Sequence, residues 1–150
     1  EEEKTAFVQS PDEMHQLGRG MGIGGGAMNG LAAFNANQIK TLREQYPDSQ
    51  VILVRPDTVP DDIGMIFDCD GLLTARGGAT SHAAVTAVRL GKVCVVSCDG
   101  LEVDVDDEFG QLNGHPLKMG DEIAIDGNLG LVYLGHYQTE KMKLGKGYNY

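Results

Sequence analysis

The chain has 150 residues, 41% of them hydrophobic and 23% charged, a composition that suits one globular domain needing no disulfide or structural metal to fold. Its formal net charge of -10 argues against nucleic acid as a partner, because duplex binding depends on Lys and Arg neutralising phosphates. No segment approaches the roughly 20 apolar residues of a membrane span, and no signal peptide is visible at the start, so we expect a soluble domain.

The three cysteines, Cys69, Cys94 and Cys98, lie inside apolar runs and are expected to be buried free thiols. A structural zinc site needs four ligands at short spacings, and only the Cys94/Cys98 pair comes close, along one predicted strand. We therefore expect no metal site. Free thiols favour a cytoplasmic location, and the missing initiator methionine fits a piece of a longer chain.

The first third of the chain is rich in glycine. Residues 1–16 are polar and are expected to form a flexible N-terminal segment. The glycine-dense stretch at 18–30 indicates either a loop or strands that pass very close to another backbone. A G-x-G-x-x-G pattern begins at Gly20, but a dinucleotide fingerprint needs a preceding strand, and residues 12–19 make a poor one.

The middle of the chain alternates between helical and strand patterns. Residues 37–46 have apolar residues at helical spacing, with Asn35 or Asn37 as the cap. The elements that follow are a strand at 50–55, a short helix opening at Pro60, a strand at 70–75, a helix at about 81–90 and a strand at 92–98. This order predicts a three-layer α/β arrangement with some parallel pairing.

The last third changes to antiparallel β-structure. Asn113-Gly114 and Asp126-Gly127 are strong turn signals, and residues 122–125 and 131–134 are expected to pair as a hairpin. The tail at 137–150 is polar and is expected to be a linker.

Several polar residues of this chain have ordinary structural explanations. The acidic run at 104–108 lacks the glycine and glutamate spacing of an EF-hand and is expected to be a solvated turn. His15, His115 and His136 lie in polar, loop-like contexts and are expected at the surface.

One segment combines residues that suit anion chemistry. Gly77 and Gly78 end a strand, Thr80 or Ser81 can cap the next helix, and His82 then falls in its first turn. Amide hydrogens are unpaired there, and the helix dipole disfavours an imidazolium ion, which leaves a neutral, nucleophilic ring near pH 7.

The same amides would stabilise the oxygens of a phosphoryl group on the ring, as helix N-termini do for anions. The two glycines leave room for that group, and the neighbouring hydroxyls can donate to it. Arg76 is the cation nearest in sequence. On chemistry alone, a satisfied histidine near a helix start explains His82 equally well.

The string Gly-Gly-Ala-Thr-Ser-His-Ala-Ala-Val at 77–85 resembles the phosphohistidine signature of the phosphoenolpyruvate-utilising enzymes, a family that includes pyruvate phosphate dikinase, phosphoenolpyruvate synthase and enzyme I of the sugar phosphotransferase system. Residues 51–58, 91–96 and 120–127 are most similar to the dikinase branch. The resemblance covers residues 17–136, which we take as the swivelling domain.

The resemblance implies a β/β/α swivelling fold and a phosphocarrier function. His82 would take a phosphoryl or pyrophosphoryl group from an ATP-grasp nucleotide domain of the parent chain and carry it to a barrel domain that binds phosphoenolpyruvate or pyruvate. Thr80 and Ser81 would help to hold the group. The domain itself would bind no cofactor, since Mg²⁺ and ATP belong to the partner domains.

The chain departs from the family pattern at one position near the histidine. The family usually carries an arginine six residues after the histidine, where this chain has Val88, followed by Arg89. One helical step is about 100° of rotation, so Arg89 does not replace that arginine directly. This departure leaves open a swivelling domain that has lost phosphotransfer and acts as a spacer or interaction module. The second acceptor, the oligomeric state and any regulation at Thr80 also stay open.

Overall fold

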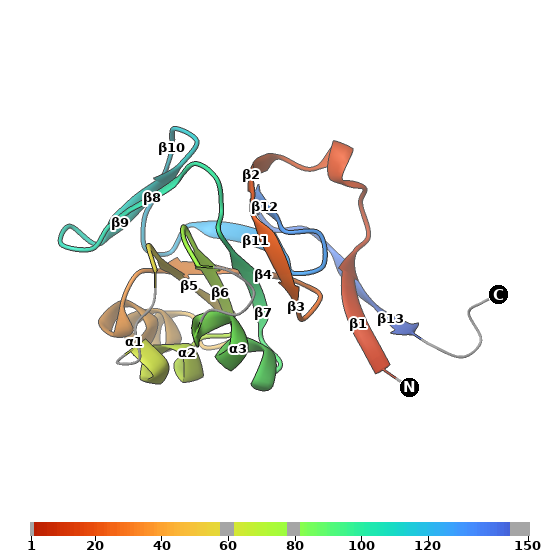
Figure 1. The fold of residues 1–150 in the computed structure, drawn as a ribbon, viewed down its shortest axis with the longest axis horizontal. Coiled ribbons are helices and arrows are strands. Elements are labelled where there is room, and N and C mark those ends of the chain that lie inside the picture. Colours follow the sequence, from red (N-terminus) through yellow and green to blue (C-terminus); the bar gives the residue numbers. More distant parts are fainter. Residues whose placement is uncertain (1, 58–61, 78–81, 145–150) are drawn as a thin grey trace.

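The computed structural model describes residues 2–57, 62–77 and 82–144, which form a large mixed sheet with further layers on its two faces (Figure 1). The large sheet has eight strands, of which β4 to β7 pair in parallel. In spatial order they are β2 (Gln16–Arg19), β12 (Leu131–Leu134), β11 (Glu122–Asp126), β4 (Ala27–Ala33), β5 (Val51–Arg55), β6 (Gly71–Thr74), β7 (Val93–Val96) and β3 (Met21–Gly24).

In the described part of the chain, three helices and a smaller sheet cover this large sheet (Figure 1). The helices α1 (Ala36–Gln45), α2 (Ile63–Asp68) and α3 (His82–Arg89) connect the parallel strands. The smaller antiparallel sheet contains β8 (Leu101–Asp104), β9 (Phe109–Leu112) and β10 (His115–Leu117). A single 3-10 turn, Pro11–Glu13, precedes β2.

Alternation along β5 shows how the layers are held together. Ile52 and Val54 belong to a core cluster that includes Leu101, Leu112 and Leu117 of the small sheet. Val51 and Leu53 belong to a second cluster with buried residues of all three helices: Ile39, Leu42, Ile66, Ala84 and Ala87. Because successive strand residues point to opposite faces, the parallel strands are buried on both sides. The expected three-layer β/β/α fold with C-terminal hairpins is confirmed.

The cap of α1 distinguishes between the two asparagines considered from the sequence. The Asn35 side chain accepts a hydrogen bond from the Gln38 amide at 2.8 Å, and the Gln38 side chain accepts one from the Phe34 amide, also at 2.8 Å. This reciprocal arrangement satisfies two backbone donors at the helix start. Asn35 is therefore the cap.

The glycine-dense stretch consists largely of strands, and β2 includes residues that had seemed a poor strand. A Cβ atom on Gly22 would lie 2.5 Å from the Gly127 carbonyl oxygen and 2.8 Å from the Gly130 nitrogen. Glycines are thus needed because two backbones approach closely. The strand β4 begins at Ala27, two residues after Gly25, so the helix that a dinucleotide fingerprint requires is replaced by a strand.

The two ends of the described chain pair with each other, which the sequence did not indicate. Strand β1 (Glu2–Phe7) lies antiparallel to β13 (Thr139–Leu144), away from the helices (Figure 1). The Phe7 ring meets Tyr133 edge to face at 5.6 Å, and the Asn29 side chain exchanges hydrogen bonds of 2.7 and 2.8 Å with the Tyr137 backbone. These contacts attach the ribbon to the large sheet. The division into residues 1–16, 17–136 and 137–150 stays a prediction.

Within the described residues, no helix has the length and apolar character required to cross a membrane.

The Gly22 contact predicts a stability effect. Gly22→Ala should lower the free energy of unfolding by about 1–3 kcal/mol, because the added methyl group would overlap the Gly127 carbonyl. Gly64→Ala is the matched control: nothing lies within 4 Å of the added carbon in α2, so the helix should gain about 0.5 kcal/mol. Urea unfolding followed by circular dichroism measures both. Equal effects of the two substitutions would contradict the close-approach explanation.

Candidate functional site

The candidate site lies where the loops after the parallel strands begin. Parallel strands present their carboxyl ends at one edge of a sheet, so the segments after β4, β5, β6 and β7 leave from the same side. The segment after β6 leads to α3, whose first residue is His82, and this agrees with the predicted position of His82 in the first turn of the helix. Gly78, Thr80 and Ser81 lie outside the described residues. For His82 the structure describes the backbone, at a helix N-terminus where amide hydrogens are unpaired.

The start of the β6–α3 loop is held along its first side by β5. The Ala75 amide donates to the Arg55 carbonyl at 3.2 Å, and the Arg76 amide donates to the Pro56 carbonyl at 3.0 Å. The buried Thr74 hydroxyl donates to the Arg76 carbonyl at 2.7 Å. The loop therefore leaves the sheet in one direction, and the Arg76 side chain is exposed at this edge.

The residues that follow β7 hold the same loop from its second side. The Cys98 amide donates to the Thr74 carbonyl at 3.0 Å. The Ser97 hydroxyl donates to the carbonyl of Gly77, which has a φ of 107° that a residue with a side chain rarely adopts. Of the predicted site residues, the structure thus brings Arg76 and Gly77 into a framework of backbone and hydroxyl hydrogen bonds. Four residues separate Gly77, where this framework ends, from the first residue of α3.

Arg55 is a residue of this edge that the sequence analysis did not select. Its guanidinium is mostly buried at the end of β5, where one nitrogen donates to the Phe34 carbonyl at 2.8 Å and another lies 3.9 Å from the Asp62 carboxylate. In the part of the chain that the structure describes, its buried Nε atom has no hydrogen-bond partner. The sequence did contain a signal for Arg55: it is a basic residue at the end of an apolar strand, directly before Pro56.

The faces of α3 differ in character. Ala84 and Ala87 are fully buried, and these small side chains let the helix lie close to the sheet. Val85 and Val88 are 45% and 54% exposed, and Arg89 is exposed in the last turn. Position 88, where the resemblance leads one to expect an arginine, is therefore a surface position occupied by an apolar side chain.

The segment of sequence that contains α3 lacks acidic residues. The chain has 22 acidic residues, yet none occurs between Gly71 and Cys98, a segment that carries Arg76, Arg89 and Lys92. Acidic side chains near a bound phosphoryl group would repel it, whereas arginine and helix amides attract it. Residues 14–43 form a second long segment without acidic residues, so the absence of acidic residues alone does not mark a site. At the strand, loop and helix that contain His82, it coincides with a helix N-terminus, which suits an anion.

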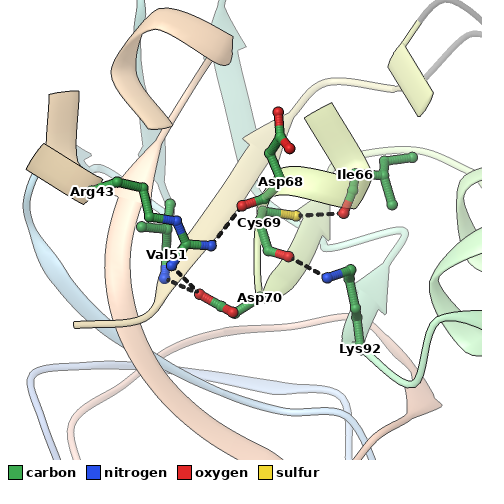
Figure 2. Close-up of polar contacts among 7 residues, drawn as sticks. All are labelled: Arg43, Val51, Ile66, Asp68, Cys69, Asp70 and Lys92. Carbon is green, nitrogen blue, oxygen red and sulfur yellow. Dashed lines mark hydrogen bonds and ion pairs between the residues drawn. The ribbon is translucent and has the colours of Figure 1, made fainter. Parts of the chain in front are cut away.

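A polar network braces the opposite edge of the sheet (Figure 2). Arg43 of α1 pairs with the Asp70 carboxylate at 3.0 Å and donates to the Asp68 carbonyl at 2.6 Å. Asp70 also accepts the Val51 amide at 2.9 Å, and the Lys92 ammonium donates to the carbonyl of Cys69 at 2.6 Å. These bonds join the ends of the helices to the starts of β5, β6 and β7.

The three cysteines are buried free thiols, as expected from the sequence. All three are free and buried, and burial raises the pKa of Cys69 to about 11 and those of Cys94 and Cys98 to about 12. A thiol reacts as its thiolate, which is scarce at neutral pH in these surroundings. Across residues 2–57, 62–77 and 82–144, no cluster of three or more acidic, His or Cys side chains could hold a metal ion.

Residues 105–108 form the turn between β8 and β9, which confirms the interpretation of the acidic run as a turn. His15 and His136 are exposed, whereas His115 is half-buried and its ring lies 6.4 Å from that of His15.

Comparisons with known proteins identify the family of this chain. The family model of the PEP-utilising enzyme mobile domain matches residues 47–130. This chain belongs to that family. Pyruvate, phosphate dikinase of Entamoeba histolytica is 39% identical over 132 residues, which are 88% of this chain and 15% of the relative. The same enzyme of Clostridium symbiosum is 37% identical over 125 residues, 83% of this chain and 14% of the relative.

Among solved structures, an NMR solution structure of Enzyme I is 26% identical, with a TM-score of 0.42 and coverage of 59% of this chain and 32% of that one. The chain thus spans about one seventh of the length of the curated relatives it matches. In those relatives, the region similar to this chain is joined to further sequence.

The buried thiols predict two pH-dependent observations. At pH 8, Ellman's reagent should react with the folded protein far more slowly than with the urea-unfolded protein, because a pKa raised from 9.0 to about 11 leaves about 100-fold less thiolate. Above pH 9, the unfolded chain releases thiol protons that the folded chain retains, so stability should fall as pH rises towards about 11.

At pH 10, the loss for three such thiols is on the order of 3–4 kcal/mol, measurable by urea unfolding. Rapid reaction of any one thiol in the folded protein at pH 8 would contradict its burial.

Proposed function

We propose that this domain is a phosphocarrier in which His82 accepts a phosphoryl or pyrophosphoryl group and delivers it to a second site of the parent chain. The observation that carries the proposal is the position of His82 as the first residue of α3, at the carboxyl edge of the parallel strands and inside a segment free of acidic residues. Membership of the mobile-domain family supports it.

The transfer needs a nucleophile and hydrogen-bond donors that stabilise the negative charge of the phosphoryl oxygens. A neutral imidazole nitrogen of His82 attacks the phosphorus of the donor, an N–P bond forms, and the P–O bond to the leaving group breaks with its electron pair. The helix amides then face the phosphoryl oxygens. In the delivery step the acceptor oxygen attacks the same phosphorus and the N–P bond breaks, which returns the ring to its starting state.

The supporting residues follow from their places around His82. Arg76 would offset the charge of the carried group, and Gly77 and Gly78 would leave space for it. The hydroxyls of Thr80 and Ser81 would donate to its oxygens. These assignments rest on position and on the family signature; of these residues, Gly78, Thr80 and Ser81 lie outside the described part of the chain.

The partners would be two other domains of the same chain. The dikinase relatives are several times longer than this chain, which supports a parent that contains the donor and acceptor sites. We propose an ATP-grasp domain that holds ATP and Mg²⁺, and a barrel domain that binds phosphoenolpyruvate or pyruvate, while this domain holds no cofactor. Buried free thiols support a cytoplasmic location.

Phosphorylation of His82 tests the proposal. The natural full-length protein incubated with Mg-ATP or with phosphoenolpyruvate should gain mass by intact-mass spectrometry, and the gain should be acid-labile and alkali-stable. His82→Ala should abolish it, because the nucleophile is gone. His136→Ala, which removes an exposed histidine, should retain the full gain.

The size of the gain would separate a phosphoryl from a pyrophosphoryl group. No gain with either donor, in a folded protein whose other domains bind their ligands, would sink the carrier assignment and favour the spacer. That alternative draws on Val88 standing in place of the expected arginine.

A further inference from the structure

Ser97 has a left-handed backbone conformation although it does not lie in a hairpin turn. Its φ is 53°, in the left-handed region that residues with a Cβ atom avoid. Among the described residues other than glycine, Glu108 and Asn113 also have a positive φ. Those two lie in the turns of the β8–β9 and β9–β10 hairpins, where this conformation is common. Ser97 instead follows β7, at the edge where the site loop begins.

The unusual backbone is accompanied by a specific contact. The half-buried Ser97 hydroxyl donates to the Gly77 carbonyl, twenty residues away in the sequence. Next to it, the Cys98 amide donates to the Thr74 carbonyl at 3.0 Å. The turn after β7 thus holds both ends of the described loop segment from Thr74 to Gly77. Strain of this kind persists where the surrounding structure fixes it, and it often occurs at functional sites.

We infer that Ser97 is a positioning residue for His82, an inference that rests on the proposed phosphocarrier function. The Ser97 hydroxyl fixes the Gly77 carbonyl, and only four residues separate Gly77 from the first turn of α3. Phosphoryl transfer needs the attacking nitrogen about 3–3.5 Å from phosphorus and in line with the leaving group. A fixed Gly77 raises the fraction of molecules in which the start of α3 has the geometry for attack.

The test separates this function from a contribution to folding. Ser97→Gly removes the hydroxyl and also relieves the left-handed backbone, so the protein should unfold at an unchanged or higher temperature. The first-order rate of His82 phosphorylation at saturating donor should nevertheless fall about fivefold, the effect of losing one hydrogen bond from the reactive geometry. The donor concentration that gives half the maximal rate should not change.

Two further variants complete the test in the natural full-length protein. Ser97→Ala keeps the left-handed backbone and loses the hydroxyl, so its rate should fall as far as that of Ser97→Gly although it is less stable. Glu108→Gly is the matched control, since it relaxes a left-handed residue in the β8–β9 turn and should leave the rate unchanged. Single-turnover quenching with intact-mass analysis measures the rate, and calorimetry measures the unfolding temperature.

Each result has a definite meaning. If wild type is phosphorylated and Ser97→Gly matches its rate, the positioning inference is wrong while the carrier function stands. A rate that falls only in step with the unfolding temperature would also overturn the inference, because it would show a structural effect alone. If wild type is not phosphorylated, the carrier function fails and the inference fails with it.

Discussion

The parallel pairing from β4 to β7 is the constraint on which the remaining structure depends. It places the ends of all four strands at one edge, so the segments carrying Arg55, Arg76 and Ser97 meet there although they are far apart in sequence. It also buries both faces of these strands, with helices on one side and the small sheet on the other. The loops that connect these four strands to their helices consequently lie at two edges of the sheet, and one of these edges becomes available for chemistry.

The two edges of the sheet divide structural and chemical tasks between them. Ion pairs and hydrogen bonds around Asp70 join helix ends to strand starts at one edge (Figure 2). At the site edge, by contrast, Arg55 retains a buried nitrogen without a partner among the described residues, and Ser97 is held in a left-handed conformation. Proteins tolerate unpaired polar atoms and strained backbone at functional sites when the rest of the structure is well packed and hydrogen-bonded. The hydrogen bonds and ion pair around Asp70 stabilise the other edge of this sheet in that way.

Local sequence patterns were sufficient to locate the helices and strands whose signals lie within a few residues of the element itself. Periodicity and the asparagine cap located α1, and apolar runs located β5, β6 and β7, because each signal lies within a few residues of the element it marks. The β1–β13 pair and the Ser97–Gly77 bond join residues distant in sequence, so no local pattern indicated them. The strand β2 has one leucine between a glutamine, a glycine and an arginine, so it lacks the apolar run that marked β6 and β7. His82 was selected by its motif, since a histidine in a first helical turn is ambiguous on chemistry alone.

The β1–β13 ribbon has a consequence for how such a domain fits into a larger architecture. From Glu2 opposite Leu144 to Phe7 opposite Thr139, the incoming and outgoing chains run as neighbours, about 5 Å apart. A host protein can accept a unit of this kind within a surface loop without separating the two ends of that loop. A domain of this kind can therefore be joined to different neighbouring domains through one pair of adjacent strands.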